Sequence, residues 1–386
     1  MKICFVDSTT GTLTGGSESI IYNLACELSK RHEVSILTGR MQGLEILSHI
    51  QNGPFKTITV PYLSRVAPMN EVWRARLRLP LRFDFEAVSF FIGFLFSRNA
   101  RRHLSGCDVV SFHYPMTSLL FSWYLKLKGI PSVFHTPGHV NGKRFFRFNR
   151  STLYLGNSYD TERKIFLQTD HHADGVVTPG VLPESSVPRR AFDPDKPILV
   201  AVSRFTRAKG VFRLLEIFAL VRESVPGARL VMLGLNYEGT ALHDAIVRLG
   251  LEDAVQVVGR VPFSEVGGYY SNADMLLHPS YPESFGMVVL EAMSYGIPVA
   301  ATNISSFREA SDGIALLLPG ASGVEWPRST YQLWAREIAS LFRDPERMAW
   351  YSAEGRKHAL RNTWDKKAVE YEGYLAKAVA MRGRTP

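Results

Sequence analysis

The stretch that most constrains the fold of this chain covers residues 278–298 and reads HPSYPESFGMVVLEAMSYGIP. It begins where a short apolar run, Met275 to His278, stops at a proline and gives way to a polar loop. From Phe285 onward the apolar residues recur about every 3.6 positions, which predicts a helix that ends at the Gly-Ile-Pro sequence. The stretch therefore predicts a strand, a loop and a helix in direct succession.

Two carboxylates flank the start of this predicted helix. Glu283 precedes it and Glu291 follows eight positions later, about 2.2 helical turns, so both can face the same cleft at different depths. Between them, the backbone N–H groups of Phe285, Gly286 and Met287 open the helix and can bind an anion. Hydroxyl-binding carboxylates on either side of a phosphate site suit a nucleotide sugar. Taken alone, the spacing is better explained by an ordinary helix with a capping Glu and a partly buried second Glu, because carboxylates at this spacing are common on helices.

The length of 386 residues predicts two domains, each large enough for its own core. Apolar residues make up 46% of the chain and charged residues 21%, which is ordinary for a globular protein. The formal net charge of +9 favours anionic partners: nucleotide phosphates, acidic lipid surfaces or nucleic acid.

The three cysteines, Cys4, Cys26 and Cys107, lie far apart in apolar runs and form no C-x-x-C pair. This pattern predicts reduced, buried thiols in a cytoplasmic protein. We expect no signal peptide, because the first apolar run is short and ends in a charge. The longest uncharged apolar run, residues 87–97, has 11 residues. A membrane span needs about 20, so we expect the chain not to cross a bilayer.

The N-terminal region shows the opening of a doubly wound α/β domain. Residues 2–7 read as a buried strand, residues 19–30 as a helix and residues 33–38 as a second strand. The loop between the first strand and the helix is not G-x-G-x-x-G, which argues against an ordinary dinucleotide site. Gly15 and Gly16 instead allow the backbone to approach a phosphate closely, although a plain tight turn explains them equally well.

An arginine-rich segment follows, Arg65 to Arg82, with aromatic and leucine residues between the arginines. We interpret it as a surface patch that can bind anionic lipid. Residues 87–104 are predicted to form a core helix. Nucleic-acid binding is the weakest alternative, because no nucleic-acid motif accompanies the arginines.

Three histidines, His113, His135 and His139, follow predicted strands, where ligands of open α/β sheets collect. They are candidates to orient a substrate hydroxyl or a phosphate. A zinc site is the competing interpretation, and the absence of a nearby cysteine or a third ligand at helical spacing argues against it.

Residues 184–197 are rich in Pro, Ser, Arg and Asp and are predicted to be a linker. The linker contains Asp193-Pro-Asp195, a formal D-x-D, which we interpret as loop chemistry and not as a metal site. The βαβ rhythm restarts at a strand over 198–203. Arg204 and Lys209 bracket the loop after it, where two cations would neutralise a diphosphate without a metal. Two solvated loop charges are the alternative.

These residues together carry a resemblance that covers nearly the whole chain. In the C-terminal half it rests on Ser203-Arg204, Lys209-Gly210, Gly259-Arg260-Val261, Ala273-Asp274, Pro279-Ser280, Glu283 to Ala292 and Gly296-Ile-Pro298-Val299. In the N-terminal half it rests on Gly15-Gly16-x-Glu18, Asp108 to His113 and Gly129-Ile-Pro131. In this order and spacing, the chain resembles the retaining GT-B glycosyltransferases of family 4.

The resemblance implies two Rossmann-like doubly wound domains facing a central cleft. Residues 1–183 would form an acceptor-side domain and residues 198–365 a nucleotide-sugar domain, with a last helix over about 366–386 packing back on the first. The family's usual Asn-Gly-Val-Asp before the linker reads Pro179-Gly180-Val181-Leu182 here, so no role is transferred to that segment.

The resemblance also implies roles for individual residues. Arg204 and Lys209 would bind the donor diphosphate, Glu291 the ribose, and Glu283 the hydroxyls of the transferred sugar. The remaining donor-side roles fall to Phe285, Gly286 and Met287 through their backbone, to Gly15 and Gly16 at the phosphate, and to Arg260 beside the base. His113 would reach the sugar near its 6-position, and His135 and His139 would lie on the acceptor side.

The expected reaction transfers a sugar from a UDP- or GDP-sugar with retention, by same-face attack and without cofactor or metal. The expected acceptor is a lipid-linked or cell-surface glycan precursor, and a small soluble acceptor is the alternative. A non-catalytic anionic-lipid-binding protein is the competing class. In the favoured interpretation, the protein docks on the inner face of the plasma membrane through Arg65–Arg82.

Overall fold

The computed structural model divides the chain into two compact units. Unit 1 contains Met1–Pro179 and Trp364–Pro386, and unit 2 contains Gly180–Thr363. The structure describes residues 1–12, 15–41, 45–62, 85–136, 138, 143–183, 190–281, 283–320 and 325–382. Within these residues, no helix is both long enough and apolar enough to span a bilayer.

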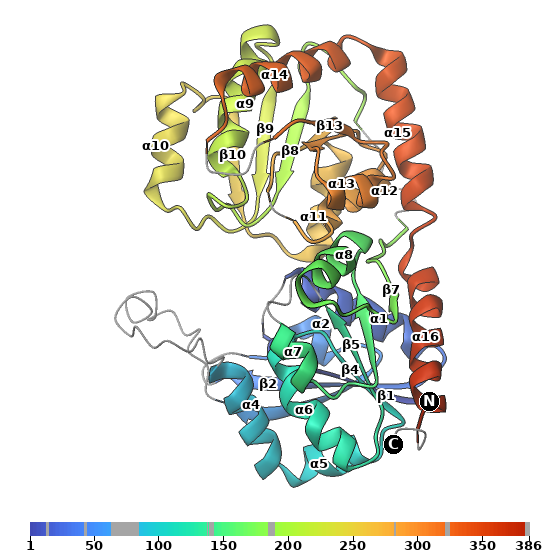
Figure 1. Cartoon of the computed structure of the whole chain (residues 1–386). Coiled ribbons are helices and arrows are strands. Elements are labelled where there is room, and N and C mark those ends of the chain that lie inside the picture. The colour runs from blue at the N-terminus through green and yellow to red at the C-terminus, as the bar shows by residue number, and fades with distance from the viewer. Residues whose placement is uncertain are drawn as a thin grey trace. The chain divides into compact units, whose positions relative to one another are not determined.

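Unit 1 is built on a seven-stranded sheet in the order β3-β2-β1-β4-β5-β6-β7 (Figure 1). Its strands are β1 (Lys2–Asp7), β2 (Glu33–Met41), β3 (Lys56–Tyr62), β4 (Val109–Phe112), β5 (Ser132–Thr136), β6 (Leu153–Gly156) and β7 (Gly175–Val176). Its helices are α1 (Gly16–Ser29), α2 (Ser48–Gln51), α4 (Phe85–Phe96), α5 (Arg98–Ser105), α6 (Pro115–Leu127), α7 (Lys143–Phe148), α8 (Tyr159–Thr169) and α16 (Trp364–Ala380). Every strand pair in this sheet is parallel.

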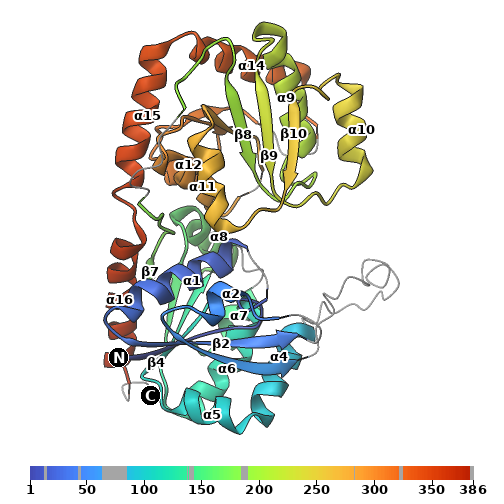
Figure 2. The ribbon, with the colours of Figure 1, turned by 180° about the vertical axis from the view of Figure 1, so that it is seen from behind.

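Helices cover both faces of this sheet, and its central strands β4 and β5 are accordingly buried along their whole length. Helices α4 and α6 pack together on one face, while α1 and α16 pack together on the other, as Figures 1 and 2 show from opposite sides. Helix α16 is the last of the chain, and its Tyr371 and Leu375 are fully buried in unit 1.

The sequence predicts one core helix over residues 87–104, and the structure corrects this to two. Helix α4 ends at Phe96, and the side chain of Ser97 accepts a hydrogen bond from the N–H of Ala100 at 3.2 Å. An N-cap of this kind starts a new helix, so α5 follows with its own axis.

Unit 2 has a six-stranded parallel sheet in the order β10-β9-β8-β11-β12-β13. Its strands are β8 (Ile198–Val202), β9 (Arg229–Leu233), β10 (Val255–Gly259), β11 (Met275–His278), β12 (Val299–Thr302) and β13 (Leu316–Leu318). Its helices are α9 (Val211–Ser224), α10 (Thr240–Arg248), α11 (Phe263–Ser271), α12 (Met287–Ser294), α13 (Ser305–Ser311), α14 (Arg328–Phe342) and α15 (Pro345–Ala359). Leu199 and Leu277 contribute to the core on one face of the sheet, Val200 and Leu276 to the core on the other.

The segment predicted as a linker, 184–197, is described from residue 190 onward, and this part lies in unit 2. Arg190 forms an ion pair with Asp274, which is buried and also accepts a hydrogen bond from the N–H of Ile198 at 2.8 Å. Asp193 accepts from the N–H of Asp195 at 3.0 Å and so closes a turn within the segment. These contacts fasten residues 190–197 to the amino ends of β8 and β11.

Each sheet has one point where the strand order reverses direction. In unit 1 this point lies between β1 and β4, and in unit 2 between β8 and β11. The loops that leave such neighbouring strands run to opposite faces of the sheet, and the space between them is where open α/β sheets bind ligands. The functional residues are therefore expected at the carboxyl ends of these four strands.

Candidate functional site

In unit 2, the loops after β8 and β11 approach each other closely at the switch point. Gly210 ends the first loop with a φ of 76° and caps α9. A Cβ atom at this position would lie 2.5 Å from the carbonyl oxygen of Pro279 in the second loop. Any other residue would push the loops apart, because both the φ and the short distance exclude a side chain.

The two loops are joined by a cluster around the carboxylate of Glu283. Its Oε1 atom lies 2.7 Å from Nζ of Lys209, accepts a hydrogen bond from Ser280 Oγ at 2.8 Å, and lies 3.4 Å from Nε2 of His278. Among the described residues, Oε2 of Glu283 has no partner. One carboxylate oxygen is thus fixed by protein groups, and the other is left as a hydrogen-bond acceptor.

The carboxylate of Glu283 stays ionised although it is mostly buried. Burial by itself would raise its pKa, but the hydrogen bond and charge of His278 and the ammonium of Lys209 outweigh it and lower the pKa to about 2. The sequence assigned Lys209 to the phosphates and Glu283 to the sugar. The structure adds that these two side chains are in direct contact.

Arg204 lies exposed in the same loop, and among the described residues its guanidinium has no hydrogen bond or ion pair. Arg207, three positions on, is engaged by Glu238 at 3.3 Å and lies over the ring of Phe212. Arg260 follows the end of β10 and is exposed. Of the two arginines in the β8 loop, Arg204 is therefore the one whose charge is available to a ligand.

The predicted helix after this loop begins two residues later than the sequence suggested. Phe285 is buried in the core, Gly286 caps the helix with a φ of 93°, and Met287 is the first helical residue. A Cβ on Gly286 would lie 2.4 Å from the ring of Phe307, so only glycine fits. The first turn of α12 thus begins four residues after Glu283. The N–H of Val289 donates to the carbonyl of Gly286 at 2.9 Å, whereas those of Met287 and Val288 have no acceptor within the helix.

Glu291 lies within α12, eight residues after Glu283, and its surroundings are less polar than those of Glu283. Its carboxylate accepts a hydrogen bond from the Tyr270 hydroxyl at 3.3 Å, and Tyr270 stacks on Tyr295. Burial raises the pKa of Glu291 to about 7, which the single hydrogen bond from Tyr270 opposes only in part. No basic side chain among the described residues pairs with it.

In unit 1, the loop after β1 is organised by Asp7 at the strand end. Its Oδ1 atom accepts hydrogen bonds from the N–H groups of Thr9 and Thr10 at 2.8 and 2.9 Å and from both hydroxyls. Gly15 then caps α1 in an extended conformation with a φ of −164°, and Gly16 is the first helical residue. The Thr9 hydroxyl also lies 3.0 Å from a carboxylate oxygen of Glu18, so its single proton can be donated either to Asp7 or to the first turn of α1.

Two of the predicted histidines lie together at the ends of β4 and β5. The rings of His113 and His135 are 4.9 Å apart, and both are buried. Ser111 Oγ lies 3.3 Å from Nε2 of His113 and 2.6 Å from the hydroxyl of Tyr371, while Nε2 of His135 donates to the carbonyl of Val177 at 2.9 Å. In both histidines Nδ1 is buried without a hydrogen-bond partner among the described residues.

Both imidazoles are neutral at physiological pH. Burial lowers the pKa of His135 to about 4, and burial together with the neighbouring His135 lowers the pKa of His113 well below its ordinary value. His139 and the segment Arg65–Arg82 lie outside the described residues. Sequence reasoning gave no role to His278, Ser280, Asp7 or Tyr371, and of these only His278 and Ser280, which lie in the 278–298 stretch, carried a signal.

Comparison with known families matches almost the whole chain. Residues 14–180 match the family described as glycosyltransferase family 4, and residues 184–358 match glycosyl transferases group 1. The chain belongs to glycosyltransferase family 4. Its two parallel α/β units have the GT-B fold, as the sequence predicted.

Individual proteins resemble this family 4 member over part or all of its length. It is 31% identical over 227 residues to the D-inositol 3-phosphate glycosyltransferase of Thermobispora bispora, covering 54% of this chain and 52% of that protein. The chain spans about half the length of the curated relatives it matches.

Two solved structures match over nearly their whole length. HepE of Anabaena, solved with UDP and glucose, has a TM-score of 0.71 at 17% identity and covers 98% of this chain and 100% of its own. Sucrose-phosphate synthase of Thermosynechococcus elongatus has a TM-score of 0.75 at 18% identity, with 98% and 99% covered. At such low identity these two structures show the shared fold.

Proposed function

We propose that this protein is a glycosyltransferase that moves a sugar from a nucleotide-sugar donor to an acceptor hydroxyl. The observation that carries the proposal is the Glu283 carboxylate, with one oxygen held by Lys209 and Ser280 and the other unpartnered among the described residues. An ionised carboxylate with one open oxygen accepts hydrogen bonds from sugar hydroxyls. Membership of family 4 and the UDP and glucose in the HepE structure support this choice of ligand.

The donor diphosphate binds next to this carboxylate. An ammonium group has three N–H donors, and Glu283 uses one of those of Lys209, so the others remain for phosphate oxygens. Arg204 supplies a second cation from the same loop, and the first turn of α12 adds backbone N–H groups. Glu291 accepts hydrogen bonds from the ribose hydroxyls, and Arg260 lies beside the base. The base is uracil or guanine.

Transfer proceeds with retention, by attack on the same face from which the phosphate departs. Charge that develops on the leaving phosphate is stabilised by Lys209, Arg204 and the helix N-terminus, and the phosphate oxygen takes the proton of the acceptor. Within unit 1, His113 offers a hydrogen bond to a hydroxyl group through its Nδ1, which has no partner among the described residues. Turnover should survive EDTA, and a requirement restored by Mg²⁺ or Mn²⁺ would contradict this mechanism.

A thermal-shift screen of UDP-, GDP- and dTDP-sugars identifies the donor, because a ligand that binds the folded state raises the melting temperature. Transfer from that donor, with the anomeric configuration of the product read by NMR, then tests the reaction. Glu283→Gln keeps the shape of the side chain and is expected to lose sugar binding while keeping UDP binding. Absence of any nucleotide-sugar shift, together with no transfer or hydrolysis, would end the proposal.

The acceptor is a lipid-linked glycan precursor, and unit 1 carries an apolar surface that supports docking on an anionic membrane. Helix α4 exposes Phe96 and helix α6 exposes Leu127, at 86% and 84% of their area, and Leu127 lines an apolar groove together with Trp123 of α6 and Phe148 of α7. Arg150 lies over the Trp123 ring at 4.7 Å. Apolar side chains flanked by cations match the chemistry of an anionic bilayer surface.

Co-sedimentation with phosphatidylglycerol vesicles tests this docking. Binding should weaken in high salt and fall in the double variant Phe96→Ser with Leu127→Ser. Trp350→Ser, which removes an exposed aromatic side chain of unit 2, is the matched control and should leave binding unchanged. The arginines of segment 65–82 remain a predicted contributor, tested by changing Arg74, Arg76 and Arg78 to Ser. Equal indifference to neutral and anionic vesicles would exclude membrane docking and favour a small soluble acceptor.

A further inference from the structure

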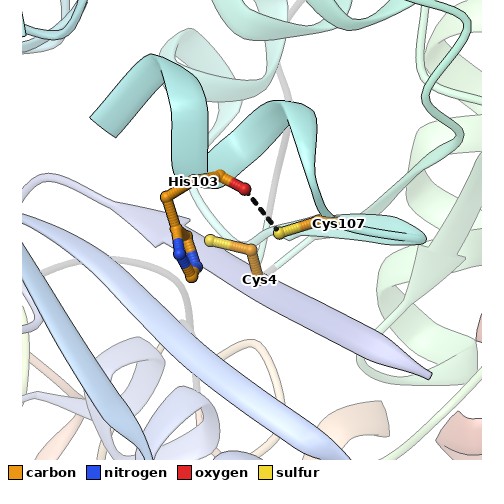
Figure 3. A group of neighbouring side chains, drawn as sticks. All are labelled: Cys4, His103 and Cys107. Carbon is orange, nitrogen blue, oxygen red and sulfur yellow. Dashed lines mark hydrogen bonds between the residues drawn. The ribbon is translucent and has the colours of Figure 1, made fainter. Parts of the chain in front are cut away.

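A second cluster of reactive side chains lies in unit 1, toward the amino ends of the strands β1 and β4. His113 follows the opposite, carboxyl end of β4. Cys4 comes from β1, His103 from the last turn of α5, and Cys107 from the residues just before β4 (Figure 3). Both sulfur atoms and one ring nitrogen lie within 4.8 Å of one another. It is the one such group of potential metal ligands in the described part of the chain.

The backbone holds the ligands of this cluster in place. After α5, the N–H of Gly106 donates to the carbonyl of His103 at 3.0 Å and the N–H of Cys107 to that of Leu104 at 3.2 Å. The Cys107 thiol points back to the His103 carbonyl at 3.4 Å (Figure 3). Cys4 is fixed in register between β2 and β4 and is completely buried. The three side chains are therefore positioned by the fold itself.

The tautomer of His103 is set by its second hydrogen bond. Nε2 of His103 lies 2.8 Å from Ser35 Oγ, and this hydroxyl donates its only proton to the carbonyl of Ile3 at 3.2 Å. When Ser35 donates to Ile3, it accepts from Nε2–H, and this arrangement leaves the lone pair of the neutral imidazole on Nδ1. Histidines that bind metal ions are commonly oriented in this way by the hydrogen bond of the other ring nitrogen.

We propose that Cys4, His103 and Cys107 bind a thiophilic d¹⁰ metal ion, Zn²⁺ or Cu⁺, as a site separate from the donor-binding residues. Two thiolates and one imidazole are ligands that both ions accept, and three protein ligands leave a position for water or another small ligand. A cavity of about 180 Å³, lined by residues that include Ser35, His103 and Cys107, provides room for it. The sequence had suggested only ordinary buried thiols here, because Cys4 and Cys107 lie in different elements.

Cobalt substitution of the full, reduced chain tests the site directly. Co²⁺ bound by two thiolates and an imidazole produces an intense thiolate-to-metal charge-transfer band and the visible bands of tetrahedral coordination. One equivalent of Co²⁺ should saturate both signals, and Zn²⁺ should displace it. Titration of Cu⁺ against a chromophoric Cu⁺ chelator measures the affinity for the second ion, and elemental analysis of the protein as purified identifies which of the two it carries.

Single variants then assign the ligands. His103→Gln and Cys107→Ser should each lower Co²⁺ affinity by at least ~100-fold, and Ser35→Ala, which only orients His103, by about 10- to 100-fold. Cys26→Ser is the matched control, because Cys26 is a half-buried thiol on α1 outside the cluster, and it should bind Co²⁺ as the unchanged protein does. His103 is half-buried, so His103→Gln can be tested in a folded protein even where Cys107→Ser unfolds.

Three outcomes would overturn the proposal. The first is a reduced protein that shows neither a charge-transfer band nor stoichiometric Zn²⁺ or Cu⁺. The second is a band that persists in folded His103→Gln. The third is loss of two thiols on mild oxidation with no metal binding in the reduced state, which would make Cys4 and Cys107 a redox pair instead.

Discussion

The two units place polar clusters at equivalent points of their sheets, but the clusters differ in charge. In unit 2, the end of β11 and the loop after β8 hold an ionised carboxylate, Glu283, with the ammonium of Lys209. In unit 1, the ends of β4 and β5 hold two neutral imidazoles, His113 and His135, with hydroxyls and carbonyls as partners. Neighbouring cationic groups keep the carboxylate of the first cluster ionised, whereas burial keeps the imidazoles of the second cluster neutral.

This difference separates the tasks that each unit can perform. Preorganised charges stabilise charge that develops on a leaving phosphate, whereas a neutral imidazole offers a hydrogen bond to a hydroxyl without attracting an anion. The comparison supports our proposal that unit 2 binds the phosphates of the donor, and it leads us to propose that the histidines of unit 1 recognise hydroxyls. This difference between the two clusters can be tested by removing charge from the cluster in unit 2 or by adding charge to the cluster in unit 1.

The largest expected effect is on turnover. Arg204→Ala and Lys209→Met should each lower kcat by about 10²- to 10³-fold, the scale of losing one preorganised donor at a developing charge. Arg207→Ala is the matched control, because Arg207 lies in the same loop but is already engaged by Glu238. Steady-state kinetics with the donor from the screen provide the measurement. Near wild-type rates in both variants would remove the diphosphate assignment.

The next effect is a dependence of unit 2 stability on pH through Glu291. Its pKa of about 7 in the folded state, against an ordinary 4.5, means that the folded state holds the proton more tightly. Stability contributed by this group is therefore complete below pH 4.5 and is lost as pH rises to 7, by up to roughly 3 kcal/mol.

Hydrogen exchange read on peptides of α11 and α12 measures this loss. Glu291→Gln, which cannot ionise, should flatten the pH profile of these peptides. An unchanged slope in that variant would mean that Glu291 does not titrate in this range.

The stability of unit 1 should change with pH in the opposite direction to that of unit 2. The pKa of His135 is about 4 when folded and 6.5 ordinarily, so the unfolded state binds the proton more tightly. Stability is complete above pH 6.5 and is lost as pH falls to 4, again by up to roughly 3 kcal/mol, and His113 acts in the same direction. Exchange in peptides of β5 should reveal this, and His135→Gln should reduce it. Equal slopes in both units would contradict the comparison.

The smallest expected effect is the free energy of unfolding in a double-mutant cycle across the Lys209–Glu283 pair. Lys209→Met leaves a mostly buried carboxylate without its cation. Because the side chains are 23% and 14% exposed, the cost should be about 1–3 kcal/mol, below that of a fully buried pair. Adding Glu283→Gln should recover much of it. Arg248→Met, which breaks an exposed pair with Glu216, is the control and should change little. Strict additivity would mean that the pair is not coupled.

Local patterns predicted much of this architecture because buried strands and amphipathic helices are recognisable from the hydrophobic pattern of consecutive residues. The order β1, α1, β2 and the strand before Glu283 follow from such runs. The break at Ser97 was missed because the apolar run continues past it, and only the cap shows where α4 ends. The start of α12 was placed early because Phe285 fits the helical period although Gly286 has a positive φ.

Contacts between distant residues were beyond the reach of these patterns. The contact between Lys209 and Glu283 depends on β8 lying beside β11, although two strands intervene in the sequence. The meeting of Cys4 with Cys107 depends in the same way on β1 lying beside β4. Both pairs of strands are adjacent in space but distant in the sequence. The sequence patterns therefore pointed to the individual residues and did not show which residues contact each other.

The return of α16 to unit 1 has a consequence for how the chain folds during synthesis. Tyr371 is the buried partner of Ser111 beneath His113, yet it is translated after the whole of unit 2. At typical rates of synthesis, the last strand of unit 1 leaves the ribosome roughly 10–40 s before this helix. The part of the sheet face that α16 covers beside α1 therefore stays exposed until the last helix is made, and the final helix completes the first unit last.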